Sequence, residues 1–314
     1  MRVTIITPSY NQAAFLPATI ASVLNQDYAD IEYLIFDGAS TDGSVEILRA
    51  QTDPRLKWVS QKDGGQTDAL NNGLRTATGE IITFINSDDT LLPGAVHFAV
   101  EYFAAHPACD LLYGDAEIID ADGKRMQVIP STPYNLEEVV LGQQTFLQQG
   151  TFWRRRVSET IGGFDDAIQY TFDIDYWART ALAGFQLDYV PGLRAQFRMH
   201  DASKSVSQKE RFYADWRLTF AHIFAHPNTP QQVRQRESES WSYLDWHYAK
   251  LYWKDRDYDK ARSMLRPFLA HRSRTRRFFS RLMLAETYTG TRLSTLVARL
   301  YARVAGYSIG GFDY

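Results

Sequence analysis

The amino-acid sequence predicts an α/β fold in which helices flank a mostly parallel sheet, followed by a helical region at the C-terminal end. The first observation is an alternation over residues 2–119, where short runs rich in Val, Ile, Phe and Tyr alternate with segments that carry apolar residues at helical spacing. Such alternation is typical of strand–helix–strand units with parallel strands. The second observation is a change after about residue 206 to aromatic, basic sequence with helical spacing.

Five strands and four helices are expected in the first part of the chain. Each strand is a short apolar run, and each helix begins beside residues that form turns or helix caps. The expected strands are RVTIIT (2–7), EYLIFD (32–37), LKWVS (56–60), IITFIN (81–86) and CDLLYGDAEII (109–119). The expected helices are AAFLPATIASVLNQ (13–26), GSVEILRAQ (43–51), GQTDALNNGLRTA (65–77) and PGAVHFAVEYFAAH (93–106).

The pattern is less regular from about residue 125. Two further strand-like runs, LDYVPG (187–192) and RAQFRMH (194–200), close this part of the chain. Because the sequence turns helical soon afterwards, we expect a boundary between residues 206 and 212. This divides the chain into a main domain of residues 1–206 and a helical region of residues 207–314.

The composition excludes several classes of protein. With 45% hydrophobic and 23% charged residues and a net charge of −3, the chain is an ordinary globular protein and not a general nucleic-acid binder. Its single cysteine, Cys109, excludes an internal disulfide framework and a multi-thiolate zinc site. We see no signal-peptide pattern and no apolar run near the ~18 to 20 residues that span a bilayer. A cytoplasmic protein is therefore expected.

Polar residues gather where four successive strands end. The segments are TPSYN (7–11), DGASTDG (37–43), QKDGGQTD (61–68) and NSDD (86–89). Open parallel sheets bind ligands beyond the carboxyl ends of their strands, so the four segments together predict a polar ligand site at one sheet edge. Taken singly, each has the alternative interpretation of a turn with helix-capping residues.

The NSDD segment suits a metal ion that holds a diphosphate. Asp88 and Asp89 carry hard oxygen ligands of the kind that Mg²⁺ and Mn²⁺ prefer. Such an ion neutralises the charge that develops on a phosphate leaving group. The neighbouring segments would form the nucleotide pocket: Asp37 accepts from a base N–H, Tyr10 stacks on the base, Thr7 and Pro8 shape the floor, and Gly65 permits close backbone approach.

At this point the sequence resembles the inverting, nucleotide-sugar-dependent enzymes of glycosyltransferase family 2, which have the GT-A fold. The resemblance covers about residues 1–205 and consists of an ordered set of motifs. In chain order these are TPSYNQAAFLPATIASVLNQ, FDGASTDGS, KDGGQTDALNNGLRTATGEIITFINSDD, GGFDDAIQYTFDIDYWAR and RMHDASKS. The resemblance implies a Rossmann-like catalytic domain over residues 1–206.

The resemblance also implies roles for the donor side. Asp37 matches the base-binding aspartate of the family, and Asp88 and Asp89 fall in its metal-binding D-x-D region, with Asn86 where many relatives have the first aspartate. Which of the two aspartates binds metal directly is left open. His200 in RMHDASKS is a candidate for the metal or the diphosphate, and Ser203 and Lys204 for phosphate oxygens; the alternative for His200 is a solvated side chain.

The acceptor side follows from two further motifs. In TFDIDYWAR the general base of the family matches Asp173, with Phe172 where many relatives carry Glu, and Asp175 is the next candidate. The alternative for Asp175 is an acid favoured by the dipole of a helix N-terminus. The expected acceptor-side residues are Gly163, Phe164 and Asp165 of GGFD, together with Asp175 and Trp177.

The expected reaction is a direct displacement. A base removes the proton of an acceptor hydroxyl while its oxygen attacks the anomeric carbon opposite the nucleoside diphosphate. The resemblance implies a UDP-sugar donor, a glycan or lipid-linked acceptor, Mn²⁺ or Mg²⁺ as cofactor, and a place in surface polysaccharide or cell-envelope glycan synthesis. Sugar-nucleotide pyrophosphorylases are disfavoured because TPSYNQAAF lacks their Gly-rich, Arg-containing loop. A non-catalytic scaffold acting through its helical tail stays open as the alternative.

The C-terminal region carries a basic segment with interleaved apolar residues. Its arginines would suit an anionic membrane surface at the inner face of the cell membrane, and the alternative is a solvated helix face. Upstream, residues 241–270 have small and aromatic residues spaced like one helix–turn–helix unit of tetratricopeptide type, too few for an array. The arginines are Arg266, Arg272, Arg274, Arg276, Arg277 and Arg281.

Overall fold

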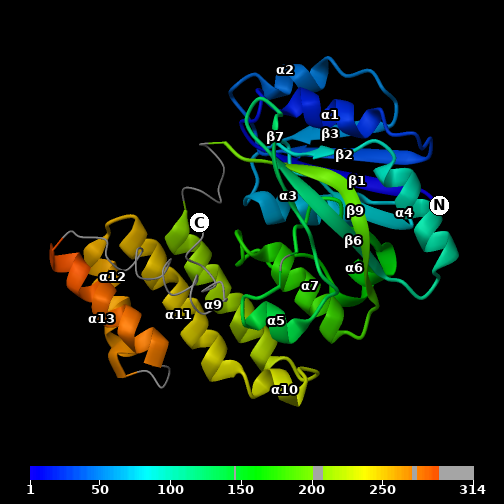
Figure 1. Cartoon of the computed structure of the whole chain (residues 1–314). Helices are drawn as coiled ribbons and strands as arrows, with labels where there is room; N and C mark the ends of the chain where they lie inside the picture. The colour runs from blue at the N-terminus through cyan, green and yellow to red at the C-terminus, as the bar shows by residue number, and fades with distance from the viewer. Residues whose placement is uncertain (145, 201–207, 271–273, 290–314) are drawn as a thin grey trace. The chain divides into compact units, whose positions relative to one another are not determined.

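The structure is a computed structural model that describes residues 1–144, 146–200, 208–270 and 274–289 (Figure 1). The chain forms two compact units, of which the first is Met1–Gln235 and the second begins at Arg236. The first unit thus extends past residue 206 and includes α9 (Lys209–Ala225) and α10 (Gln231–Arg234). The division into a catalytic domain of residues 1–206 and a separate helical region stays a prediction.

A nine-stranded mixed sheet forms the centre of the first unit. Its order is β3-β2-β1-β4-β8-β6-β9-β5, and β7 pairs with β6 at the side. The strands span Val3–Ser9 (β1), Ile31–Asp37 (β2), Leu56–Ser60 (β3), Ile81–Phe84 (β4), Thr90–Leu91 (β5), Leu111–Ile119 (β6), Arg125–Ile129 (β7), Phe152–Arg154 (β8) and Leu187–Arg198 (β9).

The first four strands of this order are parallel, as the alternation of strand and helix predicts. β1 pairs with β2 and β4, and β2 pairs with β3. Beyond β4 the sheet becomes mixed, because β8 runs antiparallel to both β4 and β6 while β6 and β9 are parallel. The predicted α/β class is confirmed, with the parallel part of the sheet at its N-terminal half.

The four predicted helices of this half are confirmed as α1 (Leu16–Leu24), α2 (Ser44–Arg49), α3 (Gln66–Thr76) and α4 (Ala95–Ala105). Each follows a strand and returns the chain to the start of the next one. The two strand-like runs near residue 190 join into one long strand, β9, which passes through Gly192 at a φ of 125°. That conformation is open to glycine, so the Pro-Gly pair bends the strand without ending it.

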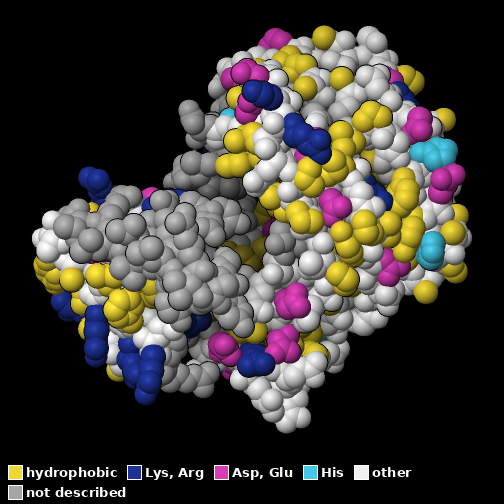
Figure 2. Space-filling model, viewed as in Figure 1, with side chains coloured by type: hydrophobic (Ala, Val, Ile, Leu, Met, Phe, Trp, Pro, Cys, Tyr) yellow, Lys and Arg dark blue, Asp and Glu magenta, His cyan; other side chains and the backbone are white. Residues whose placement is uncertain are grey.

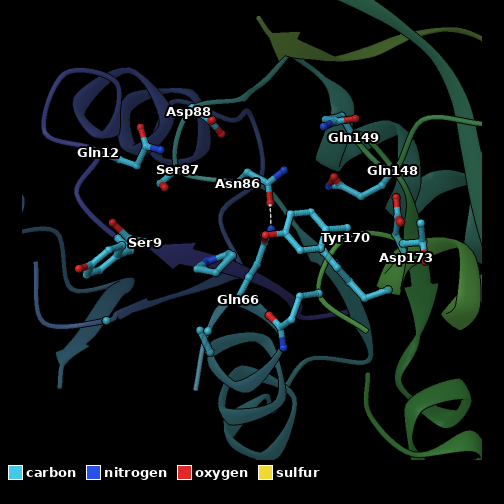
Figure 3. Close-up of a pocket in the computed structure, with 18 of the residues that line it drawn as sticks. Ser9, Gln12, Gln66, Asn86, Ser87, Asp88, Gln148, Gln149, Tyr170 and Asp173 are labelled. Atoms are coloured by element: carbon cyan, nitrogen blue, oxygen red, sulfur yellow. Dashed lines mark hydrogen bonds between the residues drawn. The ribbon is translucent and has the colours of Figure 1, made fainter. Parts of the chain in front are cut away.

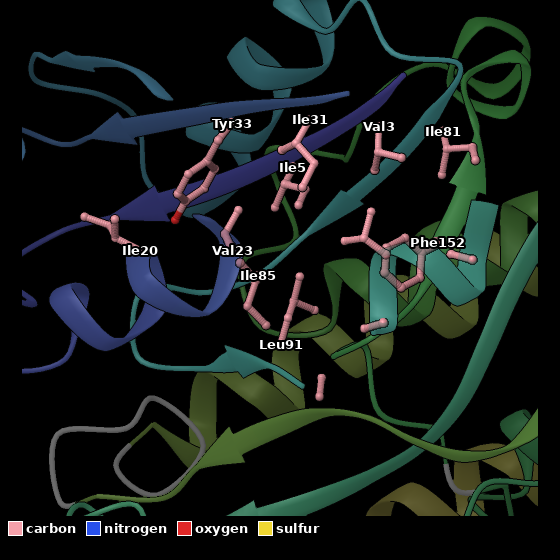
Figure 4. Packing of buried hydrophobic residues seen from close by; sticks show 14 of the residues in the cluster. Val3, Ile5, Ile20, Val23, Ile31, Tyr33, Ile81, Ile85, Leu91 and Phe152 are labelled. Atoms are coloured by element: carbon pink, nitrogen blue, oxygen red, sulfur yellow. The ribbon is translucent and has the colours of Figure 1, made fainter. Parts of the chain in front are cut away.

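Side chains on the two faces of β1 point into two separate apolar clusters. Val3 and Ile5 pack with Leu16, Ile20 and Val23 of α1 on one face of the sheet (Figure 4). Ile6, on the other face, belongs to the cluster that contains Leu70 of α3 and the aromatic side chains of α7 (Phe172–Leu182). The alternation of side chains along a strand therefore supports helices on both faces.

Two short helices, α5 (Leu136–Val140) and α6 (Arg155–Ile161), complete the described helices of the first unit. The second unit contains α11 (Glu237–Lys254), α12 (Tyr258–Leu265), a 3₁₀ helix at Arg266–Ala270 and α13 (Arg274–Thr289). α11 and α12 pack as one helix–turn–helix, as expected for this segment. Among the helices that the structure describes, none combines the length and the apolar character needed to span a bilayer.

Candidate active site

A pocket of about 730 Å³ opens where the strands β1 to β4 end (Figure 3). One wall of the pocket comes from the segments that follow β1, β2, β3 and β4. The opposite wall comes from residues 146–149, residues 169–174 and helix α9. The predicted convergence of the four strand-end segments is therefore observed, and the volume suits a ligand of nucleotide-sugar size.

The two adjacent aspartates of NSDD have different surroundings. Asp88 lines the pocket and its side chain is 19% exposed. Asp89 is fully buried, and its carboxylate accepts hydrogen bonds from the backbone N–H of Arg198 (2.8 Å), Nε2 of Gln149 (2.8 Å) and Nδ2 of Asn86 (3.0 Å). Burial, and then the nearby Asp88 carboxylate, raise the pKa of Asp89. Both oxygens of Asp89 thus hold protein donors, which does not favour Asp89 as a direct metal ligand.

His200 lies beside Asp88. Its Nε2 is 3.1 Å from Oδ2 of Asp88, and its ring packs against Phe15 with the ring centroids 4.5 Å apart. Strand β9 delivers His200, since the strand ends two residues earlier at Arg198. An imidazole nitrogen and a carboxylate oxygen therefore converge at the edge of the pocket. Ser203 and Lys204, also predicted near phosphate, lie outside the described residues.

The donor set at this place fits a divalent cation bound together with a phosphate ligand. Among the described residues, no three His, Cys, Asp or Glu side chains cluster into a complete metal site. Mg²⁺ and Mn²⁺ at nucleotide sites commonly take only one or two protein ligands, because phosphate oxygens and waters supply the others. Asp88 and His200 would provide those two.

Short hydrogen bonds position Asp37, the predicted base-binding residue. Asp37 ends β2, is 2% exposed, and accepts from Ser40 N–H (2.9 Å), Ser40 Oγ (2.5 Å) and Ser60 Oγ (2.6 Å). It does not itself line the pocket, whereas its neighbour Gly38 does. Asp63 lies directly against Gly38, where an added Cβ would meet its Oδ2 at 3.1 Å. Asp63 does line the pocket, so it provides the pocket with a carboxylate beside Gly38, next to the residue predicted to bind the base.

Of the other residues predicted to contact the nucleotide, three line the pocket and Thr7 does not. Pro8 and Tyr10 line the pocket, and Tyr10 is 63% exposed. Thr7 is buried beneath them, with its hydroxyl 3.1 Å from the Tyr33 hydroxyl. Gly65 lines the pocket at a φ of 116°, and a Cβ there would meet Oε1 of Gln169 at 2.8 Å. The backbone angle therefore favours glycine at residue 65, and a larger residue would also have to displace the end of the Gln169 side chain.

Asp173 lies on the opposite wall from Asp88. It is in the first turn of α7, and its Oδ1 accepts a 2.9 Å hydrogen bond from the N–H of Ile174. Figure 3 shows its carboxylate near Gln148, on the far side of Tyr170 from Asn86 and Asp88. Burial raises the pKa of Asp173 to about 6. A carboxylate with a raised pKa is a stronger base while still ionised at neutral pH.

Asp175 and Trp177 point away from the pocket. Asp175 is 1% exposed and accepts from Nε of Arg179 (2.7 Å), and its Oδ1 lies 2.9 Å from Nδ1 of His222. Trp177 is buried, with its ring 5.4 Å from Trp153 and 5.8 Å from Phe146 between ring centroids. Both residues thus organise the wall that carries Asp173, and neither lines the pocket.

The GGFD segment is held from below by Asn71 of α3. Asn71 accepts from the N–H of Phe164 (2.8 Å) and donates to its carbonyl oxygen (2.9 Å), and a Cβ on Gly163 would clash with the Asn71 amide. Phe164 is buried in the aromatic cluster of α7, while Asp165 accepts from the N–H of Ala167 (2.8 Å). None of the three predicted acceptor-side residues, Gly163, Phe164 and Asp165, lines the pocket.

Comparison with known proteins decides the family. Residues 4–162 match the model of Glycosyl transferase family 2. The chain belongs to this family. A glycosyltransferase of Nostoc sp., itself without an assigned reaction, is 28% identical over 221 residues, which cover 66% of this chain and 67% of that protein. A similar glycosyltransferase of Rickettsia conorii is 24% identical, and this chain spans 41% of its length.

Two solved structures share the GT-A fold with this family member. Residues 1–349 of Staphylococcus aureus TarS, in complex with UDP-GlcNAc, match with a TM-score of 0.62 at 16% identity, covering 99% of this chain and 95% of that one. The mannosyltransferase PcManGT of Pyrobaculum calidifontis, in complex with GDP-Man and Mn²⁺, matches with a TM-score of 0.61 at 20% identity, covering 99% and 87%.

Several pocket residues of this family 2 member escaped the sequence reasoning. Asp63 was quoted in QKDGGQTD without a role, and Tyr170, Gln148, Phe212 and Trp216 were not singled out. For Asp63 the signal was present, since it stands at a strand end like Asp37. The others come from an irregular loop and from α9, beyond the boundary predicted at residue 206. Only the packing of α9 against residues 169–171 brings its aromatic side chains to the pocket.

Proposed function

We propose that this chain is an inverting, metal-dependent hexosyltransferase that moves a sugar from a nucleoside diphosphate to an acceptor hydroxyl. The observation that supports this most directly is one pocket with Asp88 on one wall and Asp173 on the other, and with His200 Nε2 3.1 Å from the Asp88 carboxylate. That arrangement separates a diphosphate end from a base, as direct displacement requires.

At the donor end, Asp88 and His200 would hold Mn²⁺ or Mg²⁺. When bound, the ion would neutralise charge that develops on the departing diphosphate. Tyr10 and Pro8 would contact the base, and Asp63 would accept from its N–H groups, because Asp37 is buried and does not line the pocket. A UDP-sugar is our first choice of donor, because TarS was solved with UDP-GlcNAc, and PcManGT with GDP-Man makes a guanosine donor the next choice.

At the acceptor end, Asp173 would remove the proton from the attacking hydroxyl. The hydroxyl oxygen then forms a bond to the anomeric carbon while the bond from that carbon to the diphosphate oxygen breaks. Because attack and departure are on opposite sides, the configuration inverts and no covalent enzyme intermediate forms. The raised pKa of Asp173 suits the role of base at neutral pH.

The acceptor we propose is a glycan or a lipid-linked glycan of the cell envelope, reached from the cytoplasmic side of the membrane. Support comes from the second unit, where Arg266, Arg274 and Arg281 are exposed and Phe278 is 51% exposed. Figure 2 shows Lys and Arg side chains next to hydrophobic ones around α13. Arg276 differs, since it donates to Oγ of Ser242 at 3.0 Å. Arg272 lies outside the described residues.

A donor-hydrolysis assay tests the proposal. The native chain is incubated with a panel of nucleotide-sugars and Mn²⁺, Mg²⁺ or EDTA, and free nucleoside diphosphate is followed. We expect slow, metal-dependent release from one donor that is lost in Asp88→Ala. Absence of release from every donor, together with no nucleotide binding by calorimetry, would support instead a non-catalytic scaffold.

A further inference from the structure

Three aromatic side chains form part of the pocket wall that carries Asp173. Tyr170 and Phe212 have ring centroids 4.9 Å apart, and Trp216 follows Phe212 by four residues on α9, so both project from the same face of the helix. All three are half-buried and line the pocket. We name Tyr170, Phe212 and Trp216 the aromatic platform.

Hydrogen bonds between α9 and residues 169–171 hold the aromatic platform in place. Asp215 of α9 is buried and accepts from the N–H groups of Gln169 (2.6 Å) and Tyr170 (2.7 Å). One turn further along α9, the Thr219 hydroxyl is 2.8 Å from that of Thr171. Arg211 donates to the Tyr170 hydroxyl at 3.0 Å. Because residues 169–171 lead directly into the helix of Asp173, the platform and the carboxylate share one support.

A buried polar atom points to a ligand at the same place. Gln148 is 5% exposed and lines the pocket, and its Nε2 donates to the carbonyl oxygen of Phe84 at 3.2 Å. Its Oε1 is buried and has no hydrogen-bond partner among the described residues. An acceptor atom in this state is costly, and a small rotation of the Gln148 amide toward the pocket would let a ligand hydroxyl donate to it. Figure 3 shows Gln148 beside Asp173 and Tyr170.

The charges on this wall disfavour an anionic acceptor. Among the residues that the structure describes, those of segments 146–149 and 169–174 and of α9 that line the pocket include Asp173 and no Lys or Arg, and the one described lysine that lines it is Lys62 after β3. Aromatic faces carry partial negative charge and attract the weakly positive C–H groups of a sugar ring, whose hydroxyls donate to groups such as Gln148 Oε1. A neutral pyranose ring therefore matches both the platform and the unpartnered oxygen.

We propose that the acceptor presents a neutral sugar ring, which stacks on the aromatic platform, donates a hydroxyl to Gln148, and so holds its reacting hydroxyl at Asp173. This inference rests on the proposed function and names the chemical class of its acceptor. It also assigns α9, which lies beyond the family match and beyond residue 206, to the catalytic pocket.

The test measures transfer in the full chain with the donor found by hydrolysis. The probes are p-nitrophenyl glycosides of several neutral hexoses and N-acetylhexosamines, compared with glycerol and glycerol 3-phosphate. We expect at least one glycoside to accelerate diphosphate release. Trp216→Ala should raise the KM for that glycoside roughly tenfold or more, as loss of one stacking contact implies. Donor hydrolysis without acceptor should fall less in Trp216→Ala than transfer to the glycoside does, and Trp216→Phe should recover most of the loss of transfer.

Tyr213→Ala is the matched control, because Tyr213 is a half-buried aromatic residue of the same helix that does not line the pocket. Gln148→Ala should also raise the KM for the glycoside. Acceleration by glycerol 3-phosphate in place of every glycoside would overturn the inference, as would an unchanged KM in Trp216→Ala. An equal loss of donor hydrolysis in Trp216→Ala would reduce the platform to a structural role. Failure of the proposed function is distinguishable, because the native chain would then release no diphosphate at all.

Discussion

The backbone N–H of Arg198 donates a 2.8 Å hydrogen bond to the buried Oδ1 of Asp89. The Arg198 side chain adds a second link, from its Nε to the carbonyl oxygen of Asp88 at 2.8 Å. These contacts join the end of β9 to the segment between β4 and β5 across more than a hundred residues of sequence. They bring His200 to the Asp88 carboxylate, so the buried Asp89 supports the local structure and Asp88 faces the pocket.

Substitution of Asp89 should therefore mainly lower stability, whereas substitution of Asp88 should mainly abolish metal-dependent release. Asp89→Ala leaves three buried donors without their acceptor, and we expect it to lower the free energy of unfolding by about 3 kcal/mol. Asp88→Ala, which loses the contact with His200, should lower the free energy of unfolding by only about 1 kcal/mol while abolishing metal-dependent release. Denaturant unfolding checks both. Equal stability of the two variants would contradict the division of roles.

Removal and return of metal should reveal the part of His200. EDTA is expected to stop diphosphate release, and added Mn²⁺ to restore it. In His200→Ala the Mn²⁺ concentration for half-maximal rate should rise about tenfold, because one of two protein ligands is lost. His97→Ala, at an exposed histidine paired with Glu101, serves as the control. A native Mn²⁺ requirement in His200→Ala would exclude His200 as a ligand.

The pH dependence of transfer should report Asp173. Since burial raises its pKa to about 6, the base is ionised at pH 7.5 and becomes protonated as the pH falls, so the rate should drop about tenfold per pH unit below 6. Asp173→Asn should lower transfer by about 10²- to 10⁴-fold and remove this limb. A limb retained in Asp173→Asn would assign the base elsewhere, and Asp122→Asn, an exposed carboxyl, is the control.

Stability measurements separate this loss from unfolding. A carboxyl whose folded pKa is raised destabilises the fold as the pH rises from its ordinary value through about 6. At pH 7.5 that cost is fully present in the native chain and absent from Asp173→Asn. The variant should therefore be at least as stable as the native protein while inactive in transfer.

Asn71 should be essential for the shape of the acceptor wall. Asn71→Ala removes the two hydrogen bonds to the backbone of Phe164 and a third to Asp166, and we expect a loss of about 2–3 kcal/mol in the free energy of unfolding. Asn72→Ala is the matched control, because the neighbouring Asn72 bonds to Asp68 and Arg75 on the outer side of the same helix. A loss in Asn72→Ala as large as in Asn71→Ala would refute this role.

Membrane contact can be tested by flotation with vesicles. The full chain should float with anionic phosphatidylglycerol vesicles at low salt and much less with phosphatidylcholine alone. Replacing Arg274, Phe278 and Arg281 by Ala should weaken binding roughly 30-fold or more, since each arginine contributes about 1 kcal/mol at such a surface. The double substitution Arg49→Ala with Arg75→Ala, at exposed arginines of α2 and α3, controls for the loss of two charges. Binding unchanged in the triple variant would place any membrane contact elsewhere.

Much of the first half of the fold could be predicted from sequence, because local patterns there carry the information. The strands β1 to β4 and the helices α1 to α4 have regular apolar spacing and clear turn residues, and parallel strands necessarily end at one edge. Strands β5 and β8 escaped prediction, since they are short and their pairing partners lie far away in sequence. Strand β7 pairs with the preceding strand β6, but its sequence RMQVI is mostly exposed and gives no clear apolar pattern, so it escaped prediction too. The single bent strand β9 was split for the same reason that β5 and β8 escaped prediction, because its continuity depends on β6.

For the candidate site, the sequence by itself determined which residue types meet at the sheet edge. Its ordered motifs also indicated the family. Only the tertiary structure decided which of these residues face the pocket. Asp88 and Asp173 do, whereas Asp89, Asp175 and Trp177 are buried supports, because exposure depends on long-range packing that local spacing does not encode. The same packing brought Phe212 and Trp216 of α9 to the pocket, through hydrogen bonds between Asp215 and a loop more than forty residues away.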